Sequence, residues 1–512
     1  MSETTQIEDT PKNCSRYAWA LIAVGALLRV VSFFFSNNSG GDAGAHVELT
    51  AIWLQHPTVK FVFAVYPPGH FWLIGLSTLM VHDVLTAGRL LSLVLGIASL
   101  ILVWKTARLL YGMWGGLLSL GVFSLYSLHI GYSTTSSAEV SAVFFCLAGI
   151  YFFFRYFQSG ADRAWPLAIS GACFSVAQSI RYEPWVLFAG LFVILIVLLQ
   201  VQPVRRPWGD SLRPVLVFGI TGGMWPVFIL AYAWQRFGNP LYLVHLNQLA
   251  AITFMAANPI SRIHQLALPP SVLLLSLSPL ALVGAVYGLA KSFSSRLPCA
   301  FASLTIFLGL FYAYEFSTGG MLAVARYTLI PGTMLAIVSG YGLEEICEKL
   351  FPNRIGLAHS AIFGLLFLNL VAVLAMSDLP NRYAEKFASI SPRLRYQERI
   401  RLVGEYLRSH MRPDDAVVVD NYNAESDIIA IAAGLPIIPG KRAYLLSKKY
   451  TMSVDDYINA EHPRFLVYAE RGTLQHSFQL PPGCMGIEEI HGVKFQCTYA
   501  GPTYRVYELN YQ

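Results

Sequence analysis

Long apolar stretches alternate with short polar ones over the first three quarters of the chain. A helix needs about 20 apolar residues to cross the hydrocarbon core of a membrane. Runs that approach or reach this length cover residues 17–35, 90–104, 112–130, 138–157, 165–180, 185–201, 214–234, 269–290, 297–314, 321–341 and 355–376. The pattern therefore predicts a polytopic α-helical membrane protein with about eleven transmembrane helices.

Two further apolar segments leave the number of spans open. Residues 67–81, "PPGHFWLIGLSTLMV", are too short for a comfortable span, and we predict that they are interfacial or re-entrant. If they cross, another short segment has to cross as well to keep Asp42 and Glu139 on one face, and residues 242–257 are a candidate for it. The prediction is then about 11 to 13 transmembrane helices.

The pattern changes after residue 376. Charges become frequent, and short β-like runs such as "AVVVD" and "RFLVYAE" alternate with helical stretches such as "RIRLVGEYLRSH". This indicates a small soluble α/β domain over residues 377–512. The other predicted parts are a cytoplasmic leader, residues 1–16, and a membrane module, residues 17–376, whose first outer loop covers residues 36–89.

The basic residues predict the orientation. With the N-terminus inside, every loop predicted to be cytoplasmic is basic, as the positive-inside rule requires. These loops hold Lys105, Arg108, Arg155, Arg163, Arg205, Arg206, Arg213, Lys291, Arg296, Lys349 and Arg354. Asp42, Glu139 and the α/β domain then lie on the extracytoplasmic face.

Composition excludes several classes of protein. The chain is 55% hydrophobic and 13% charged, which is not typical of a soluble protein. Its net charge of +6 is spread over the loops between spans, so nucleic-acid binding has no support. The mixed-charge leader predicts an uncleaved first helix rather than a signal peptide. Cys484 and Cys497 lie in the outer domain, and whether they pair stays open.

Charged residues gather where the spans meet the outer face. Acids and arginines at membrane depth are costly and are usually retained for a function. Carboxylates and guanidiniums on one face suggest a site that deprotonates a hydroxyl and holds an anion, such as a lipid-borne phosphate. The candidates are Asp42, Glu139, Arg181, Glu183, Arg326 and Tyr327.

Each candidate also has a purely structural interpretation. Asp42 can simply be solvated, and Glu139 can be a first-turn residue favoured by the helix dipole. Arg181 and Glu183 can pair with each other, and Arg326 can be an interfacial anchor. The prediction of a site therefore depends on the whole group rather than on any member.

Six motifs, in order, carry a resemblance to a known family. They are "GGDAGAHVELTAIW", "YPPGHFWLIGLS", "TAGRLLSLVLGIASLILVWKTARLLYG", "YSTTSSAEV", "IRYEPW" and "ARYTLIP". Over residues 17–341 the chain resembles the type C membrane glycosyltransferases, in particular the group of the dolichyl-phosphate-mannose protein mannosyltransferases and the bacterial aminoarabinose transferase of lipid A. Three positions depart from that pattern: Ala43 stands where the family often has a second acid, His46 where it has tyrosine or another residue, and Tyr66 where it often has a basic residue.

The resemblance implies transfer of a sugar from a polyprenyl-phosphate donor to an acceptor hydroxyl on the extracytoplasmic face, with inversion. Asp42 is the expected general base, and Glu139 is expected to assist it or to orient a substrate. Arg181, Arg326 and Tyr327 are expected to hold the donor phosphate. The expected substrate-binding residues are Tyr66, His46, Glu48 and Glu183, with sugar recognition in residues 239–268, where His245, Asn247, Arg262 and His264 interrupt an amphipathic pattern.

Several alternatives remain open at this point. A transporter or flippase for lipid-linked sugars would also have many spans and outer charges, although no inverted repeat is visible. A structural or receptor-like membrane protein is a third class, and neither alternative would form a glycosidic bond. The acceptor is a glycan, a lipid or a protein, and the membrane is expected to be the bacterial inner membrane. A divalent metal stays open because Asp42, His46 and Glu48 are close in sequence.

Overall fold

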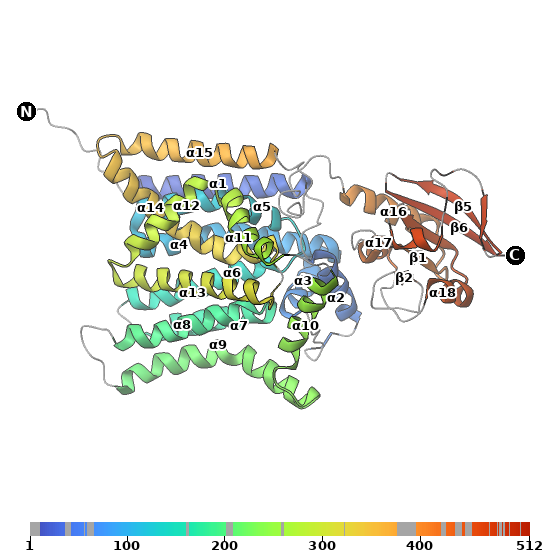
Figure 1. Ribbon diagram of the computed structural model, residues 1–512, viewed down its shortest axis with the longest axis horizontal. Helices are drawn as coiled ribbons and strands as arrows, with labels where there is room; N and C mark the ends of the chain where they lie inside the picture. Colours follow the sequence, from blue (N-terminus) through green and yellow to red (C-terminus); the bar gives the residue numbers. More distant parts are fainter. Residues whose placement is uncertain are drawn as a thin grey trace, which may run out of the picture.

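Long apolar helices lie side by side along most of the chain, and a small α/β domain lies beyond one end of this helical stack (Figure 1). The computed structural model describes residues 11–35, 42–55, 57–58, 66–159, 163–200, 208–257, 261–321, 323–375, 396–420, 426–435, 443–445, 453–469, 472–478, 480, 484, 487–490, 492–501 and 503–511. The predicted fold class, a polytopic α-helical membrane protein with a C-terminal α/β domain, is confirmed.

The membrane module consists of helices in chain order. They are α1 (Pro11–Phe35), α2 (Ala43–Gln55), α3 (Gly69–Val81), α4 (Val84–Ser124), α5 (Ser127–Tyr132), α6 (Glu139–Gln158), α7 (Trp165–Ile180), α8 (Glu183–Gln200), α9 (Trp208–Phe237), α10 (Tyr242–Ala257), α11 (Arg262–Leu277), α12 (Pro279–Ser292), α13 (Arg296–Thr318), the 3-10 helix η1 (Ala325–Thr328), α14 (Leu329–Leu350) and α15 (Ile355–Ala375).

The predicted number of spans is not confirmed. Within the described ranges, seven helices are long and apolar enough to cross a membrane, or eight if the bent pair α11 and α12 is one span. The predicted run 269–290 is broken, because α11 and α12 meet at an angle of 107° around Ser278. Ser278 precedes Pro279 and has a φ of +98°, and a residue before proline is disfavoured in the helical conformation.

Helix α4 is 41 residues long and joins two predicted spans, residues 90–104 and 112–130, across a kink. The kink is at Gly112, whose φ of +83° is readily adopted only by glycine. Farther along, α12 and α14 pack so closely that a Cβ at Gly342 would overlap the carbonyl of Gly284. Small residues at such a contact let two membrane helices approach each other.

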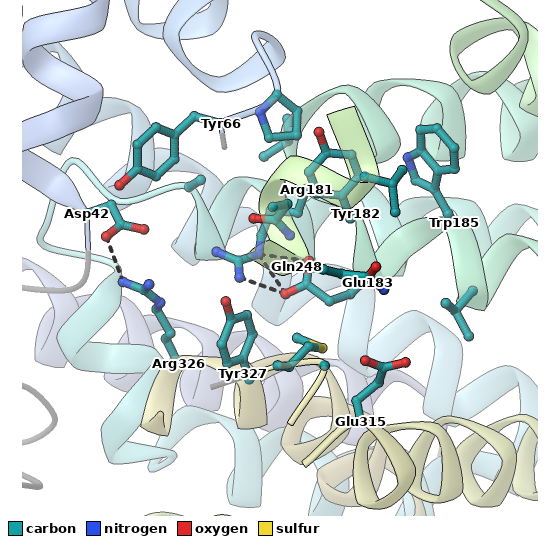
Figure 2. Close-up of a pocket in the computed structure, with 18 of the residues that line it drawn as sticks. Asp42, Tyr66, Arg181, Tyr182, Glu183, Trp185, Gln248, Glu315, Arg326 and Tyr327 are labelled. Carbon is teal, nitrogen blue, oxygen red and sulfur yellow. Dashed lines mark hydrogen bonds and ion pairs between the residues drawn. The ribbon is translucent and has the colours of Figure 1, made fainter. Parts of the chain in front are cut away.

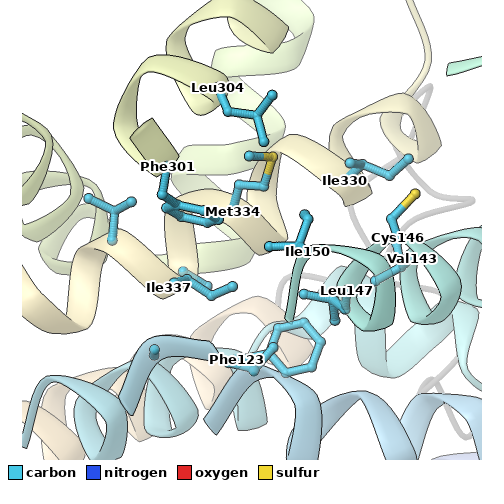
Figure 3. Close-up of a cluster of buried hydrophobic side chains, with 14 of the residues drawn as sticks. Phe123, Val143, Cys146, Leu147, Ile150, Phe301, Leu304, Ile330, Met334 and Ile337 are labelled. Carbon is cyan, nitrogen blue, oxygen red and sulfur yellow. The ribbon is translucent and has the colours of Figure 1, made fainter. Parts of the chain in front are cut away.

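The core of the membrane module is formed by side chains from α4, α6, α13 and α14 (Figure 3). Phe123, Ile150, Phe301, Met334 and Ile337 are all buried there. These residues lie on faces that repeat at helical spacing, and interdigitating side chains fix how neighbouring helices pack. The core therefore holds in place the helix ends from which the site is built.

Three short helices, α2, α3 and α10, lie at the end of the helical stack that is nearest to the α/β domain (Figure 1). Helix α3 has 13 residues, which is too short for a perpendicular span. It covers the segment that was predicted to be interfacial or re-entrant. These helices, together with the ends of the long ones, form the surroundings of the site.

The α/β domain contains α16 (Tyr396–His410), α17 (Ser426–Ala433), α18 (Val454–Glu461), the 3-10 helix η5 (Thr473–His476) and one sheet. Its strands are β1 (Val417–Val419), β2 (Ala443–Leu445), β3 (Phe465–Ala469), β4 (Ile487–Ile490), β5 (Val493–Ala500) and β6 (Tyr504–Tyr511), in the order β2-β1-β3-β6-β5-β4. Strand β1 is parallel to β2 and β3, and the other pairs are antiparallel. Cys484 and Cys497 form a disulfide, which the sequence had left open.

The α/β domain contacts the membrane module through α2. Ala51 and Ile52 of α2, and Leu85 at the start of α4, pack against the apolar core of the α/β domain. Helix α17 is the element of that domain that lies against α2. The helix that begins directly after Asp42 is therefore held on one side by the α/β domain.

Candidate active site

A cavity of about 360 Å³ lies where the short helices meet the ends of the long ones. Its walls come from α2, the residues before α3, the turn between α7 and α8, helix α10, the end of α13, and η1 (Figure 2). Six of the predicted site residues line it besides Asp42: His46, Tyr66, Arg181, Glu183, Arg326 and Tyr327. The fold therefore brings together residues that are up to about 285 positions apart in the chain.

Asp42 and Arg326 form an ion pair at the wall of the cavity. Arg326 Nη1 lies 3.0 Å from Asp42 Oδ1 (Figure 2). The carbonyl of Asp42 accepts a hydrogen bond from the backbone N–H of His46, so Asp42 is fixed at the first turn of α2. Its side chain keeps 26% of its surface exposed, which leaves the carboxylate within reach of a ligand in the cavity.

Arg181 is engaged on three of its nitrogens. Its Nη2 and Nε donate to Glu183 Oε1 at 2.6 and 3.0 Å, and its Nη1 donates to Glu139 Oε1 at 2.6 Å. Glu139 and Glu183 are the first residues of α6 and α8, where the helix dipole favours a negative charge. The Arg181–Glu183 pair expected from the structural interpretation is thus present, and it is joined to a larger network.

Glu139 contacts both Arg181 and Arg326 from the buried side of the cavity wall. Its Oε1 contacts Arg181 and lies 3.7 Å from Arg326 Nε, while its Oε2 is buried without a hydrogen-bond partner. The side chain is 3% exposed and does not line the cavity. This geometry places Glu139 behind Arg326 and suits a positioning role better than direct contact with a substrate.

The arginines keep their charge in this network. Burial alone would lower the pKa of Arg326, but Asp42 and the other groups around it raise that pKa well above its ordinary value. Burial likewise opposes the charge of Arg181, and Glu183 and Glu139 outweigh it and raise its pKa. Tyr327 lies under both guanidiniums, with its ring centre 5.2 Å from the Arg181 carbon and 5.6 Å from that of Arg326.

Tyr66 and His46 form the wall beside Asp42. Burial and the adjacent Asp42 carboxylate raise the pKa of Tyr66, so its hydroxyl stays protonated. Burial, then the charges of His70, Arg181 and Arg326, lower the pKa of His46 well below 6.5. The His46 ring centre lies 5.2 Å from that of Tyr66 and 4.9 Å from that of His70. Both groups are therefore neutral near pH 7.

Part of the chain matches a known protein family. Residues 65–236 match the family model described as dolichyl-phosphate-mannose-protein mannosyltransferase. The match includes Tyr66, Glu139, Arg181 and Glu183, whereas Asp42 and Arg326 lie outside it. No curated protein sequence matches the chain significantly.

Solved structures show the same fold at low sequence identity. The structure of ArnT from Cupriavidus metallidurans bound to undecaprenyl phosphate matches with a TM-score of 0.64 and 11% identity, over 96% of this chain and 98% of that one. The oligosaccharyltransferase of Archaeoglobus fulgidus in its apo form matches with a TM-score of 0.55 and 10% identity, over 88% and 69%. The chain therefore has the type C fold of these membrane proteins. The predicted resemblance to the type C membrane glycosyltransferases is thereby confirmed.

Not every predicted site residue reaches the cavity. Glu48 is buried on α2 but does not line it. Within the predicted sugar-recognition segment, residues 239–268, Asn247 lines the cavity, whereas His245, Arg262 and His264 do not. In the described part of the chain no group of three His, Cys, Asp or Glu side chains is arranged to hold a metal ion, so Asp42, His46 and Glu48 do not form one there.

Sequence reasoning missed several residues that line the cavity. They are Tyr182, Trp185, Phe311 and Met321, and Glu315 was given no role. Glu315 carried a signal, since it is an acid at the outer end of an apolar run. The aromatic residues had no such signal, because aromatic side chains are common wherever helices meet the membrane surface.

Proposed function

We propose that this protein is a glycosyltransferase that moves a sugar from a polyprenyl-phosphate donor to an acceptor hydroxyl of a glycan, a lipid or a protein on the extracytoplasmic face. The observation that carries the proposal is the Asp42–Arg326 ion pair, exposed in a cavity at the end of the membrane helices. The ArnT structure holds undecaprenyl phosphate, and a structure of AglB from Archaeoglobus fulgidus holds dolichol-phosphate. A polyprenyl phosphate is therefore the donor lipid that the fold suggests.

Such a donor has an apolar lipid chain and a charged phosphate, and the cavity offers both apolar and charged side chains. Apolar side chains such as Val186, Phe311 and Met321 line part of it, which suits a ligand that carries a lipid chain. Its charged wall includes Arg326, whose planar guanidinium can bind phosphate oxygens in a bidentate manner. A lipid phosphate bound here would place the anomeric carbon of its sugar near Asp42.

The proposed step is a single displacement. The acceptor hydroxyl oxygen attacks the anomeric carbon, its proton passes to Asp42, and the bond between that carbon and the phosphate oxygen breaks. A new glycosidic bond forms, polyprenyl phosphate leaves, and attack on the side opposite to the phosphate inverts the configuration. Asp42 is suited to be the base because its carboxylate is accessible from the cavity.

The ion pair couples the two halves of this step. While Asp42 is ionised, it occupies one edge of the Arg326 guanidinium. When Asp42 takes the proton it becomes neutral, and the charge of Arg326 becomes available for the phosphate oxygen on which negative charge develops. Proton transfer and departure of the phosphate would thus assist each other.

The remaining charged residues would hold Arg326 in place. Glu139 and Glu183 accept hydrogen bonds from Arg181 on three of its nitrogens. We therefore assign Arg181 mainly to orienting Glu139, and only secondarily to binding the phosphate. Glu139 in turn contacts Arg326 from the buried side. Tyr66 and Tyr327, both neutral, supply hydroxyl donors close to the base and the arginines.

Two observations support the proposed orientation. The loops predicted to be cytoplasmic are basic. The α/β domain contains the Cys484–Cys497 disulfide, and disulfides persist in oxidising compartments outside the cytoplasm. We therefore propose an enzyme of a bacterial inner membrane whose cavity and α/β domain face the periplasm.

The proposal is tested by measuring turnover with purified protein. The full chain is incubated with a panel of polyprenyl-phosphate sugars and candidate acceptors, and free polyprenyl phosphate and new glycoside are quantified together. Equimolar appearance of both products with inverted anomeric configuration is expected. Translocation of the intact donor in liposomes without any new glycosidic bond would instead identify a flippase.

A further inference from the structure

Three polar residues of the cavity have no part in the proposed step. They are Glu315 near the end of α13 and Asn247 and Gln248 of α10. In Figure 2, Tyr327 lies between the Asp42–Arg326 pair and Glu315. A group that contacts Glu315, on the opposite wall, is therefore held at some distance from the base.

A turn at the end of α13 leaves space for the Glu315 carboxylate. Helix α13 ends at Gly319, whose φ is +79°, and the N–H groups of Gly319 and Gly320 both donate to the carbonyl of Glu315. The turn thus folds back over Glu315, and a Cβ at position 320 would overlap its carboxylate. The backbone at this point leaves space for the acid beside the cavity.

The Glu315 carboxylate also lacks a cation. Among the described residues, the two arginines of the cavity are paired with Asp42, Glu139 and Glu183, and neither forms an ion pair with Glu315. An ionised carboxylate is only an acceptor of hydrogen bonds, with about four sites on its two oxygens. Its natural partners in a ligand are therefore hydroxyl or amide donors, and a second negative charge is repelled.

The surroundings suit a sugar ring. Asn247 and Gln248 add amide groups that both donate and accept hydrogen bonds. Tyr182, from the turn between α7 and α8, and Trp185, in the first turn of α8, add aromatic surface to the same cavity. Because the acceptor hydroxyl has to reach Asp42, the ring that contacts the opposite wall belongs to the donor.

We propose that Glu315 determines which sugar the donor carries: it accepts hydrogen bonds from hydroxyl groups of a neutral hexose and rejects a sugar with its own carboxylate. This inference rests on the proposed function, since it assigns one wall of the same cavity to the donor's sugar. Glu315 is a specificity-determining residue and takes no part in bond formation.

The test measures donor binding, which needs no acceptor. Dissociation constants of the full-length protein are measured for three probes: polyprenyl phosphate, polyprenyl-phosphate glucose and polyprenyl-phosphate glucuronate. Wild type is expected to bind the glucose probe at least about tenfold more tightly than the glucuronate probe, because the Glu315 carboxylate repels the carboxylate of glucuronate. Glu315→Gln should reduce that preference to within about threefold while binding polyprenyl phosphate as wild type does.

Two variants separate specificity from folding. Glu315→Asp keeps the charge and should still reject glucuronate. Glu345→Gln removes an acid of α14 that pairs with Lys291, outside the cavity, and should leave all three constants unchanged. An unchanged preference in Glu315→Gln, or equal weakening of all three probes, would overturn the assignment. Failure of wild type to bind any polyprenyl phosphate would overturn the proposed function and this inference together.

Discussion

Arg326 contacts two carboxylates whose surroundings differ. Asp42 is partly exposed in the cavity, whereas Glu139 is buried behind the guanidinium. A planar guanidinium can serve both partners at once, and a lysine ammonium offers no such fixed geometry. The charge of residue 326 and its shape therefore both matter at this position.

Substitution of Arg326 should affect the rate more than donor binding. Loss of one donor that stabilises a developing oxyanion typically costs about 100-fold or more in kcat. We expect a loss of that order for Arg326→Ala and a smaller loss for Arg326→Lys, measured in the turnover assay. Arg236→Lys, at the exposed end of α9, is the matched control and should behave as wild type. Full activity of Arg326→Lys would contradict the need for a bidentate group.

The buried histidines beside the site should make stability depend on pH. Burial lowers the pKa of His46 well below 6.5 and that of His70 to about 4. Between these values and 6.5 the unfolded chain binds more protons than the folded one, so the free energy of unfolding falls as the pH falls. The melting temperature should decrease from pH 7 to pH 5, and less so in His46→Asn. An equal decrease in both proteins would remove His46 from this effect.

At the scale of elements, α2 connects the site to the α/β domain. Asp42 directly precedes it, His46 on its first turns lines the cavity, and Ile52 near its end packs against the α/β domain. The Thr50 hydroxyl lies within hydrogen-bond distance of the carbonyls of His46 and of Phe71 in α3. The position of the base thus depends on contacts at the other end of a 13-residue helix.

Weakening that contact should lower the rate without removing the site. We expect Ile52→Ala to reduce kcat by about tenfold, because small displacements of a catalytic group are costly, and to leave donor affinity nearly unchanged. Ile52→Val should restore most of the rate. A parallel loss of donor affinity and of melting temperature in Ile52→Ala would indicate a general loss of folding instead.

Sequence patterns predicted the position of most elements, but not the breaks within them or the contacts between them. Hydropathy is a local property, so the long helices, the short segment that became α3 and the change to an α/β domain could all be anticipated. The break at Ser278 and the joining of two spans across Gly112 depend on backbone conformation at single residues. The Arg181–Glu139 contact joins residues 42 positions apart and depends on how α6 and α7 pack, which no local pattern contains.

At the scale of the whole molecule, the predicted site was recovered largely because acids and arginines are rare at membrane depth. Asp42, Arg181, Glu183, Arg326 and Tyr327 all line the cavity. Helix α10 was anticipated as part of the predicted sugar-recognition segment, residues 239–268, and Asn247 and Gln248 of this helix line the cavity. The aromatic and apolar residues of the cavity are types that occur throughout membrane proteins, and only the packing of the helices distinguishes them.

The proposed orientation of the molecule makes a separate prediction. Protease added to intact spheroplasts should digest the α/β domain, residues 396–511, while a tag on the N-terminus stays protected until the membrane is lysed. The fragments are followed by immunoblotting against tags at both termini. Digestion of the N-terminal tag in intact spheroplasts, with an intact α/β domain, would reverse the assigned orientation.

The central claim is that Asp42 removes the proton of the acceptor, and one measurement tests it most directly. Wild type, Asp42→Asn and the exposed control Asp455→Asn are purified, and kcat is compared with the dissociation constant for the donor. The account predicts that kcat falls by at least about 100-fold in Asp42→Asn alone, while donor affinity and melting temperature stay close to wild type. Turnover of Asp42→Asn within about twofold of wild type would contradict the account, because an asparagine cannot accept that proton.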